Sequence, residues 1–431
     1  MEEESKKKLK IFLHVLEPNI INSGTVSNIY QLEMDAKILE NSSIESYDAK
    51  KPSSSSLPKI NPIFSFSHKV KFYPEGMSCV LLGSKLYFMG SSLTYKADLL
   101  GLSCYYMDYR EYENGFDEAI NNFLNEQLEN YPRDVYVFDC DTCQLLPDDS
   151  CLPMHSGKYR NPLTFVANDQ IFVLSLKKVH KDMITFESMK PGHGWEKLTP
   201  PPPFFLFRSN SPVGSALIKD NFLLTFSTGR SNIILSYNII SDEWTLRESY
   251  HLPQLFLGSI FVQDTLYTAV REPLRRTYFK YNSPVLSFGP LKSTTDVDGT
   301  TLDYVAVNRS RKVSDFGENS SICYNDIRNW PIHVNEFGFA TRCFLHLGGL
   351  LKGTEKSSRF FGFVELFNPF PGEYEDTDTQ SELRFVAFEA LPNKNSANVD
   401  AEFHARTIHS SHFSTDIFGT GCLNAACAYL V

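Results

Sequence analysis

The sequence lacks long apolar runs, an excess of basic residues and a regular cysteine framework, and each absence excludes a class of protein. No stretch approaches the roughly 18 consecutive apolar residues of a membrane-spanning helix. The chain has 41 Lys and Arg against 51 Asp and Glu, so we expect no nucleic-acid partner and no membrane partner. Nine cysteines without regular spacing are typical of reduced thiols. These observations predict a soluble cytoplasmic protein, with the nucleus as the alternative compartment.

One motif recurs along the chain. An aromatic residue ends a β-branched run, a polar turn follows, and a large apolar residue starts the next run. Six residues separate Phe138 from Leu145, Tyr237 from Trp244, and Tyr281 from Phe288, and a longer turn separates Phe186 from Trp195. The leading aromatics recur at intervals of 48, 51 and 44 residues, a period that predicts repeated structural units. Trp195 and Trp244 are therefore expected to be buried in outer strands.

A second pattern precedes each of these motifs, in which two apolar runs flank a short polar turn. The segments are SCVLLGSKLYFMG, LTFVANDQIFVLSL, GSALIKDNFLLTFS and GSIFVQDTLYTAV. Such a pattern predicts a β-hairpin. Two hairpins in about 45 residues make a four-stranded sheet, and its near-continuous apolar strands need cover on both faces.

These residues carry a family resemblance. The aromatic-to-Trp spacing of Tyr237 and Trp244, the trailing pair Leu252–Pro253 and the Gly-Gly doublet in FLHLGG resemble a degenerate kelch-type β-propeller of the plant kelch-repeat proteins. The family usually keeps a Gly-Gly in every blade, whereas the other clear units here do not. The resemblance implies an all-β propeller, and six four-stranded blades is the best count, with five or seven as alternatives.

The predicted domain layout follows from this count. Residues 70–392 form the blades, with weaker fifth and sixth copies in DYVAVNRSRKVSDFG and TRCFLHLGGLL. Residues 1–69 supply N-terminal strands and a Ser-rich loop, and residues 393–431 supply C-terminal closing strands. We expect the N-terminal segment SNIYQLEM to pair with strands in EFHARTIH or LNAACAYLV, which leaves no open edge.

Cys140 and Cys143 stand in a C-x-x-C spacing inside DVYVFDCDTCQLLPD. A zinc site needs a second pair of ligands, and the chain contains no other C-x-x-C. A thioredoxin-like motif needs a βαβ setting. In the aligned copies these cysteines fall in the turn between the two outer strands, so the pattern predicts a turn and no metal.

The segment at residues 98–131 is strongly acidic, with eight Asp and Glu residues against one basic residue, Arg110. Its second half has apolar residues at helical spacing from Phe116 to Leu128, which predicts an amphipathic helix. We interpret the segment as an insertion in the first clear blade. It is either a helix packed on its own propeller or a docking arm, because loops on a rigid scaffold carry recognition. The partner-binding candidates are Glu111, Glu113, Asp117 and Glu118, facing a basic protein partner.

The remaining candidates for chemistry are histidines. His404, His409 and His412 are close in sequence, but the odd spacing of the last two on a strand points them to opposite faces, so they are weak metal candidates. Glu243 and His251 match the outer places of the Glu, Asp, His triplet that holds iron in kelch-type nitrile-specifier proteins. Arg247 occupies the middle place, and a guanidinium would repel a cation. We assign no catalytic residue, no metal and no cofactor.

Two functional classes remain. The first is a non-catalytic protein–protein interaction scaffold or adaptor in a plant cell. The alternative is a small-molecule-binding enzyme or specifier protein of plant specialised metabolism that uses the central propeller pocket, where side chains from several blades converge.

Overall fold

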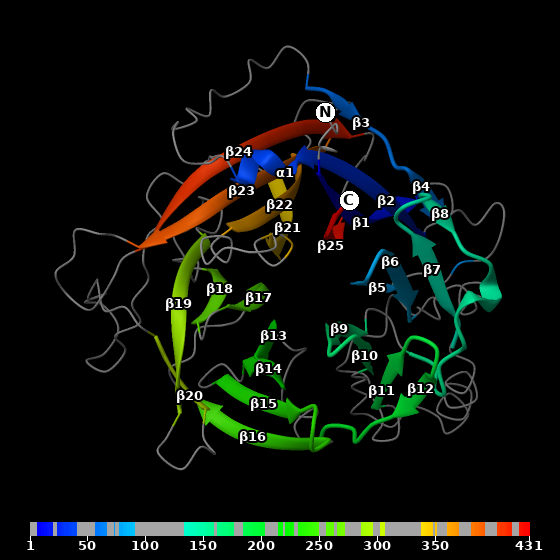
Figure 1. Ribbon diagram of the computed structural model, residues 1–431, viewed down its shortest axis with the longest axis vertical. Coiled ribbons are helices and arrows are strands. Elements are labelled where there is room, and N and C mark those ends of the chain that lie inside the picture. Colours follow the sequence, from blue (N-terminus) through cyan, green and yellow to red (C-terminus); the bar gives the residue numbers. More distant parts are fainter. Residues whose placement is uncertain are drawn as a thin grey trace, which may run out of the picture. The chain divides into compact units, whose positions relative to one another are not determined.

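The computed structural model describes residues 7–19, 24–40, 57–66, 73, 77–90, 133–158, 162–175, 184–202, 214–218, 220–227, 232–249, 256–262, 265–271, 286–295, 302–306, 338–347, 350, 360–369, 381–392, 403–415 and 422–431. The described part is almost entirely β-strand, with one short helix, α1 (Ala36–Glu40), and one 3₁₀ turn, η3 (Asp148–Ser150) (Figure 1). Its contacts divide the chain into two compact units: unit 1 contains residues 1–13, 31–61 and 207–431, and unit 2 contains residues 14–30 and 62–206.

Unit 2 contains two complete four-stranded antiparallel sheets. Sheet D runs in the order β5-β6-β7-β8, and sheet E in the order β12-β11-β10-β9. Sheet D consists of β5 (Ser78–Leu82), β6 (Lys85–Met89), β7 (Val135–Asp139) and β8 (Gln144–Leu145). Sheet E consists of β9 (Leu163–Ala167), β10 (Gln170–Ser175), β11 (Thr185–Lys190) and β12 (Gly194–Lys197).

Short polar turns build the inner hairpins, as the sequence predicts. Leu82 pairs with Lys85 across the β5–β6 turn, where Gly83 has a φ of 61°. Ala167 pairs with Gln170 across the β9–β10 turn, where Asn168 and Asp169 have φ values of 50° and 57°. Asn and Asp tolerate this left-handed conformation better than most residues, so the polar turn residues fix these registers.

Sheet D is buried on both faces, which explains its near-continuous apolar strands. One face, with Tyr87, Met89, Val135 and Val137, packs in a cluster with Ile171, Val173, Met189 and Trp195 of sheet E, and Met154 lies in the same cluster. On the other face, Phe88 contacts Phe66 and Phe138 contacts Phe64, at ring-centroid distances of 4.8 and 5.6 Å. Alternate side chains of β6 and β7 thus pack into two different apolar clusters, one on each face of the sheet, as expected for strands covered on both sides.

Unit 1 contains sheet F, whose two four-stranded antiparallel halves join through a parallel pairing of Ala216 with Ser259 and Leu217 with Ile260. The first half is β13 (Gly214–Ile218), β14 (Asn221–Ser227), β15 (Asn232–Asn238) and β16 (Glu243–Ser249). The second half is β17 (Phe256–Val262), β18 (Thr265–Arg271), β19 (Leu286–Thr295) and β20 (Leu302–Ala306). Both inner hairpins lie where the sequence predicts them.

The remaining strands of unit 1 form sheet B, in the order β21-β22-β23-β24-β3. They are β21 (Gly338–His346), β22 (Phe360–Pro369), β23 (Glu382–Pro392), β24 (Phe403–Thr415) and β3 (Lys59–Ile60). The last pairing is parallel, with Ser414 opposite Lys59. Gly362 lies in a closely packed part of β22, where an added Cβ would lie 3.2 Å from the Phe385 ring.

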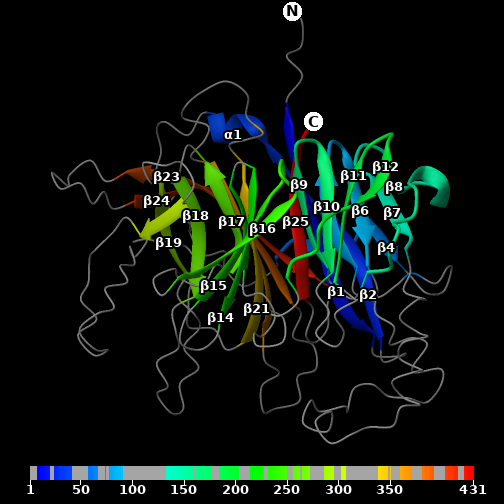
Figure 2. The same cartoon turned by 90° about the horizontal axis from the view of Figure 1, so that it is seen from below.

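Strands from both ends of the chain share one further sheet, in the order β25-β1-β2-β4. Its strands are β25 (Cys422–Leu430), β1 (Lys8–Asn19), β2 (Gly24–Asp35) and β4 (Phe64–Phe66). The backbone groups of Lys8 and Val431 exchange hydrogen bonds of 3.0 and 2.8 Å, and β25 lies alongside β1 (Figures 1 and 2). The predicted pairing of SNIYQLEM with a C-terminal strand is wrong. This segment lies in β2, which pairs with β1 and β4, and it is β1 that pairs with β25.

Three details of the predicted repeat are wrong. Trp195 lies opposite Met189, not Phe186, because a tight turn at Pro191 to His193 closes the β11–β12 hairpin earlier than the alignment assumed. Phe288 lies opposite Ala269 in β19, the third strand of its half-sheet and not the fourth. The start of DYVAVNRSRKVSDFG consequently forms β20, the fourth strand of that half-sheet, instead of a fifth hairpin. Tyr281 lies outside the described residues.

Candidate functional site

The structure describes only some of the sequence-predicted site residues. Glu111, Glu113, Asp117, Glu118 and the predicted helix lie outside the described residues. His404, His409 and His412 all lie on β24, opposite Leu391, Ala387 and Arg384, respectively. The His409 ring lies 6.2 Å from the Phe385 ring, and burial lowers its pKa. Among the described residues, no group of three or more His, Cys, Asp or Glu could hold a metal ion.

The triplet around Trp244 is only partly described. Glu243 is exposed on β16, opposite Asn238, and Arg247 lies opposite Ile234 on the same strand. His251 lies outside the described residues. Trp244 is half-buried and packs beside Tyr237, with their ring centroids 5.0 Å apart.

The C-x-x-C segment forms the turn between β7 and β8, as the sequence predicts. The Asp139 carboxylate accepts hydrogen bonds from the backbone N–H groups of Asp141 and Thr142, at 3.0 and 2.8 Å. These bonds lower the pKa of Asp139, with the bond from Thr142 as the largest cause. Cys143 adopts a left-handed φ of 54°. Phe138 lies directly opposite Leu145, as the repeat alignment requires.

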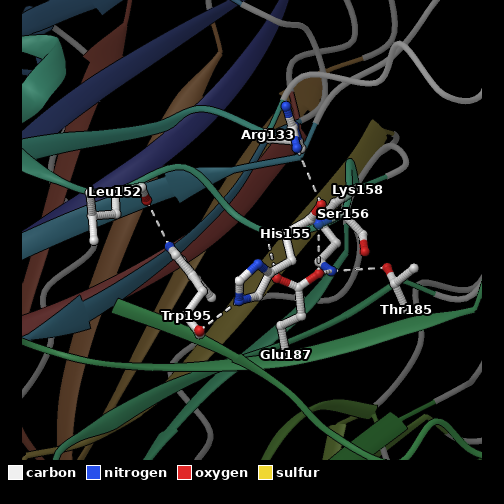
Figure 3. Close-up of polar contacts among 8 residues, drawn as sticks. All are labelled: Arg133, Leu152, His155, Ser156, Lys158, Thr185, Glu187 and Trp195. Carbon is white, nitrogen blue, oxygen red and sulfur yellow. Dashed lines mark hydrogen bonds and ion pairs between the residues drawn. The ribbon is translucent and has the colours of Figure 1, made fainter. Parts of the chain in front are cut away.

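A buried polar cluster in the described part of unit 2 centres on Glu187 of β11, a residue that the sequence analysis missed. Its carboxylate faces residues 151–158, which connect η3 to the start of sheet E and which we call the connector (Figure 3). Its Oε2 accepts a hydrogen bond of 2.8 Å from the His155 N–H, and its Oε1 accepts one of 2.9 Å from the Ser156 N–H. Lys158 Nζ lies 2.6 Å from the same Oε1.

This ion pair is fully enclosed. The side chains of Lys158 and Glu187 are 0% and 1% exposed. Removing two charges from water is costly, and the cost is offset only when the remaining polar groups find partners. Here two backbone donors complement the carboxylate, and the Lys158 ammonium also donates to Thr185 Oγ1 at 2.9 Å. The cluster therefore has the composition of a structural anchor.

Burial lowers the pKa of Lys158, and the neighbouring Glu187 charge opposes that shift. We take the pair as ionised, because the 2.6 Å contact between ammonium and carboxylate strongly favours the charged forms. An ammonium that donates to Thr185 cannot accept the Thr185 proton. In this geometry Lys158 thus holds the connector and is not a base that activates the Thr185 hydroxyl.

Trp195 provides a second attachment for the connector. Its indole N–H donates to the Leu152 carbonyl at 2.8 Å, and its own carbonyl lies 2.7 Å from His155 Nε2 (Figure 3). Its ring is 8% exposed. At the other side of the connector, the Met154 N–H donates to the Arg133 carbonyl at 2.9 Å. The connector therefore joins sheet E to Arg133, which lies two residues before β7.

A weak sequence signal for this anchor exists. Glu187 lies in the run ITFESMK. In β11 the residues on both sides of Glu187 are buried. A charged residue within such a strand usually has a partner. The identity of that partner, Lys158, depends on the path of the connector, which no local pattern records.

No protein-family model matches the sequence, and no curated protein matches it. Among solved structures, the chain is similar to TolB from Acinetobacter baumannii, with 7% identity and a TM-score of 0.37 over 97% of this chain and 66% of TolB. It is similar to YjhT, with 11% identity and a TM-score of 0.30 over 64% of this chain and 79% of YjhT. It is also similar to a subtype N11 neuraminidase-like protein of the flat-faced bat H18N11 strain, with 9% identity and a TM-score of 0.28 over 83% of this chain and 94% of that one.

Within the described residues, no helix has the length and apolar character needed to cross a membrane.

Proposed function

We propose that the chain is a degenerate kelch-type β-propeller of six four-stranded blades that acts as a non-catalytic protein–protein interaction scaffold or adaptor in a plant cell. The blade count is supported by the two halves of sheet F, the four-stranded sheets D and E, sheet B, and the sheet shared by the two chain ends. Burial of sheet D on both faces supports the propeller arrangement, because radially stacked blades cover each other in this way. The proposed compartment is the cytoplasm, with the nucleus as the alternative.

The proposed binding element is the acidic insertion at residues 98–131. The observation that carries this proposal is the pairing of β6 with β7. Met89 lies opposite Val135, and the ladder continues without interruption to Lys85 opposite Asp139. The intervening residues thus connect two adjacent strands of a sheet that is complete without them, as expected for an insertion that serves recognition.

The charge of the insertion indicates the chemistry of the partner. Eight acidic residues against one basic residue favour a basic protein surface. Long-range attraction of this kind speeds association, and salt screens it beyond roughly 10 Å at 0.1 M ionic strength. The proposed contact residues are Glu111, Glu113, Asp117 and Glu118.

The test compares two variants that carry the same change of charge. The first neutralises Glu111, Glu113, Asp117 and Glu118 to Gln or Asn. The matched control neutralises four exposed acidic residues elsewhere, Asp148, Asp149, Glu196 and Glu243. Proteins captured from native extract are compared by quantitative mass spectrometry at low and high salt. We expect the first variant to lose a partner that the control retains. Capture of this partner by the control should weaken as the salt concentration rises.

Equal capture by both variants would contradict a role for the insertion. Metal analysis of the same purified protein addresses the alternative function. A stoichiometric bound metal without a protein partner would favour a small-molecule enzyme or specifier that uses the central pocket.

A further inference from the structure

The turn between β7 and β8 places two thiols together. Asp139 caps the turn in the way that an N-cap residue caps a helix, since its Oδ1 accepts from the N–H groups two and three residues further along. Cys140 and Cys143 are the first and last residues of the four-residue turn between the paired residues Asp139 and Gln144. The first and last residues of a β-turn have Cα atoms less than about 7 Å apart, which is close to the separation that a disulfide spans.

The position of the Cys143 side chain agrees with this geometry. Cys143 Sγ lies 3.7 Å from the Cys140 carbonyl oxygen, so the side chain of the last turn residue lies close to the backbone of the first.

We propose that Cys140 and Cys143 form a reversible disulfide, which makes the β7–β8 turn a redox modification site. A disulfide needs Cβ atoms about 3.5–4.5 Å apart, so closing the bond requires a local adjustment of the turn. The turn can absorb such a shift, since only the short strand β8 follows it. A disulfide that forms with a local distortion is readily reduced, as regulatory disulfides are.

The exposure of the two residues sets the order of the reaction with glutathione disulfide. Cys143 is partly exposed, whereas Cys140 is fully buried. The Cys143 thiol loses its proton, and the thiolate attacks one sulfur of glutathione disulfide, releasing one glutathione thiolate and leaving a mixed disulfide. The Cys140 thiolate then attacks Cys143 Sγ, which forms the internal disulfide and releases the second glutathione. The two cysteines are oxidised, one glutathione disulfide is reduced, and two protons pass to solvent.

The test uses the full-length protein, treated with glutathione disulfide and then alkylated and digested with trypsin. The peptide between Arg133 and Lys158 contains Cys140, Cys143 and a third cysteine, Cys151, which serves as the internal control. We expect the peptide to lose two hydrogen atoms, with fragments that place the bond between Cys140 and Cys143. Dithiothreitol should reverse the change. The Cys151→Ser variant should behave as the wild type, and the Cys143→Ser variant should lose the internal disulfide and leave Cys140 unmodified.

Three outcomes would overturn the proposal. They are a Cys143–glutathione adduct that persists without closing, a disulfide that includes Cys151, and unreacted Cys143 under conditions that oxidise another cysteine of the same protein. A thermal melt of each variant, measured in reductant, separates these outcomes from a misfolded turn.

Discussion

Three outer hairpins of the described sheets can be compared, and they are stabilised in two different ways. In sheets D and F, one side-chain oxygen closes the turn. Asn238 Oδ1 accepts from the N–H groups of Ile240 and Ser241, both at 3.0 Å, as Asp139 does in sheet D. Each turn also ends in a residue with a φ of 54°, and the N–H groups of Cys140 and Ile239 each bond to the preceding inner turn.

The β11–β12 hairpin of sheet E lacks this cap. Gly192 and Gly194, with φ values of 81° and 84°, form its turn, and its strands instead hold the connector through Glu187 and Trp195. A repeat can therefore conserve strand order while its stabilising contacts differ. In sheets D and F these contacts are local in the sequence, whereas in sheet E they are long-range.

The largest effect is expected where the contact is long-range and buried. Glu187→Ala should lower the free energy of unfolding by about 3–5 kcal/mol, because it leaves the buried Lys158 ammonium without its counterion. Denaturant unfolding of the purified protein measures this change. The exposed Glu196→Ala on the neighbouring strand β12 is the control and should change stability by less than about 0.5 kcal/mol. Similar losses in both variants would contradict the anchor.

Replacing each of the two tryptophans of the outer strands should lower the free energy of unfolding by different amounts. Trp195→Ala should cost about 3–5 kcal/mol, because it removes a buried ring and its bond to Leu152. Trp244→Ala should cost less, roughly 1–3 kcal/mol, because that ring is only half-buried. The same unfolding measurement applies, and a larger loss for Trp244 would reverse the comparison.

The two turn caps should have smaller and nearly equal effects. Asp139→Ala and Asn238→Ala should each lower stability by about 0.5–2 kcal/mol, the usual contribution of such a cap. Since Asp139 is a carboxylate whose pKa is lowered, its contribution should be present at neutral pH and fall as the pH drops through that lowered pKa. Asn238 does not titrate and is the matched control. A pH-independent effect at both positions would rule out a charged cap in sheet D.

The smallest effect is expected for the partly exposed thiol. Cys143→Ser, measured in reductant, should change the free energy of unfolding by less than about 0.5 kcal/mol. The same sample should show no loss of bound metal. A large destabilisation of the reduced protein would show that the Cys143 side chain stabilises the turn, and release of a metal would show that the turn holds one.

The sequence was sufficient to predict the all-β class, the inner hairpins and the opposition of Phe138 with Leu145 and of Tyr237 with Trp244. These features depend on turn residues and alternation, which act locally. The alignment failed at Trp195, because it assumed a longer turn than the tight turn that closes the β11–β12 hairpin. It failed at Phe288, because that residue lies in the third strand of its half-sheet and not in the fourth.

The buried anchor could not be predicted in the same way. Glu187 and Lys158 are 29 residues apart, and their contact depends on the path of the connector between two sheets. The sequence shows that Glu187 is charged, but it does not show which residue the fold brings next to it. The predicted acidic site remains a prediction, since it lies outside the described residues. The three histidines were weak metal candidates, and the described part of the chain contains no group of three or more possible metal ligands.

The central claim is that the acidic insertion carries recognition on a sheet that is complete without it. Replacing residues 91–132 with a short Gly-Ser loop tests this most directly, because Gly90 and Arg133 then rejoin β6 and β7 at their paired ends. Partner capture by this variant is compared with its thermal melt. We predict a cooperative melt within a few degrees of the wild type and loss of the partner. Unfolding of this variant would show that the insertion is part of the core. A folded variant that still captures the partner would show that the binding surface lies elsewhere.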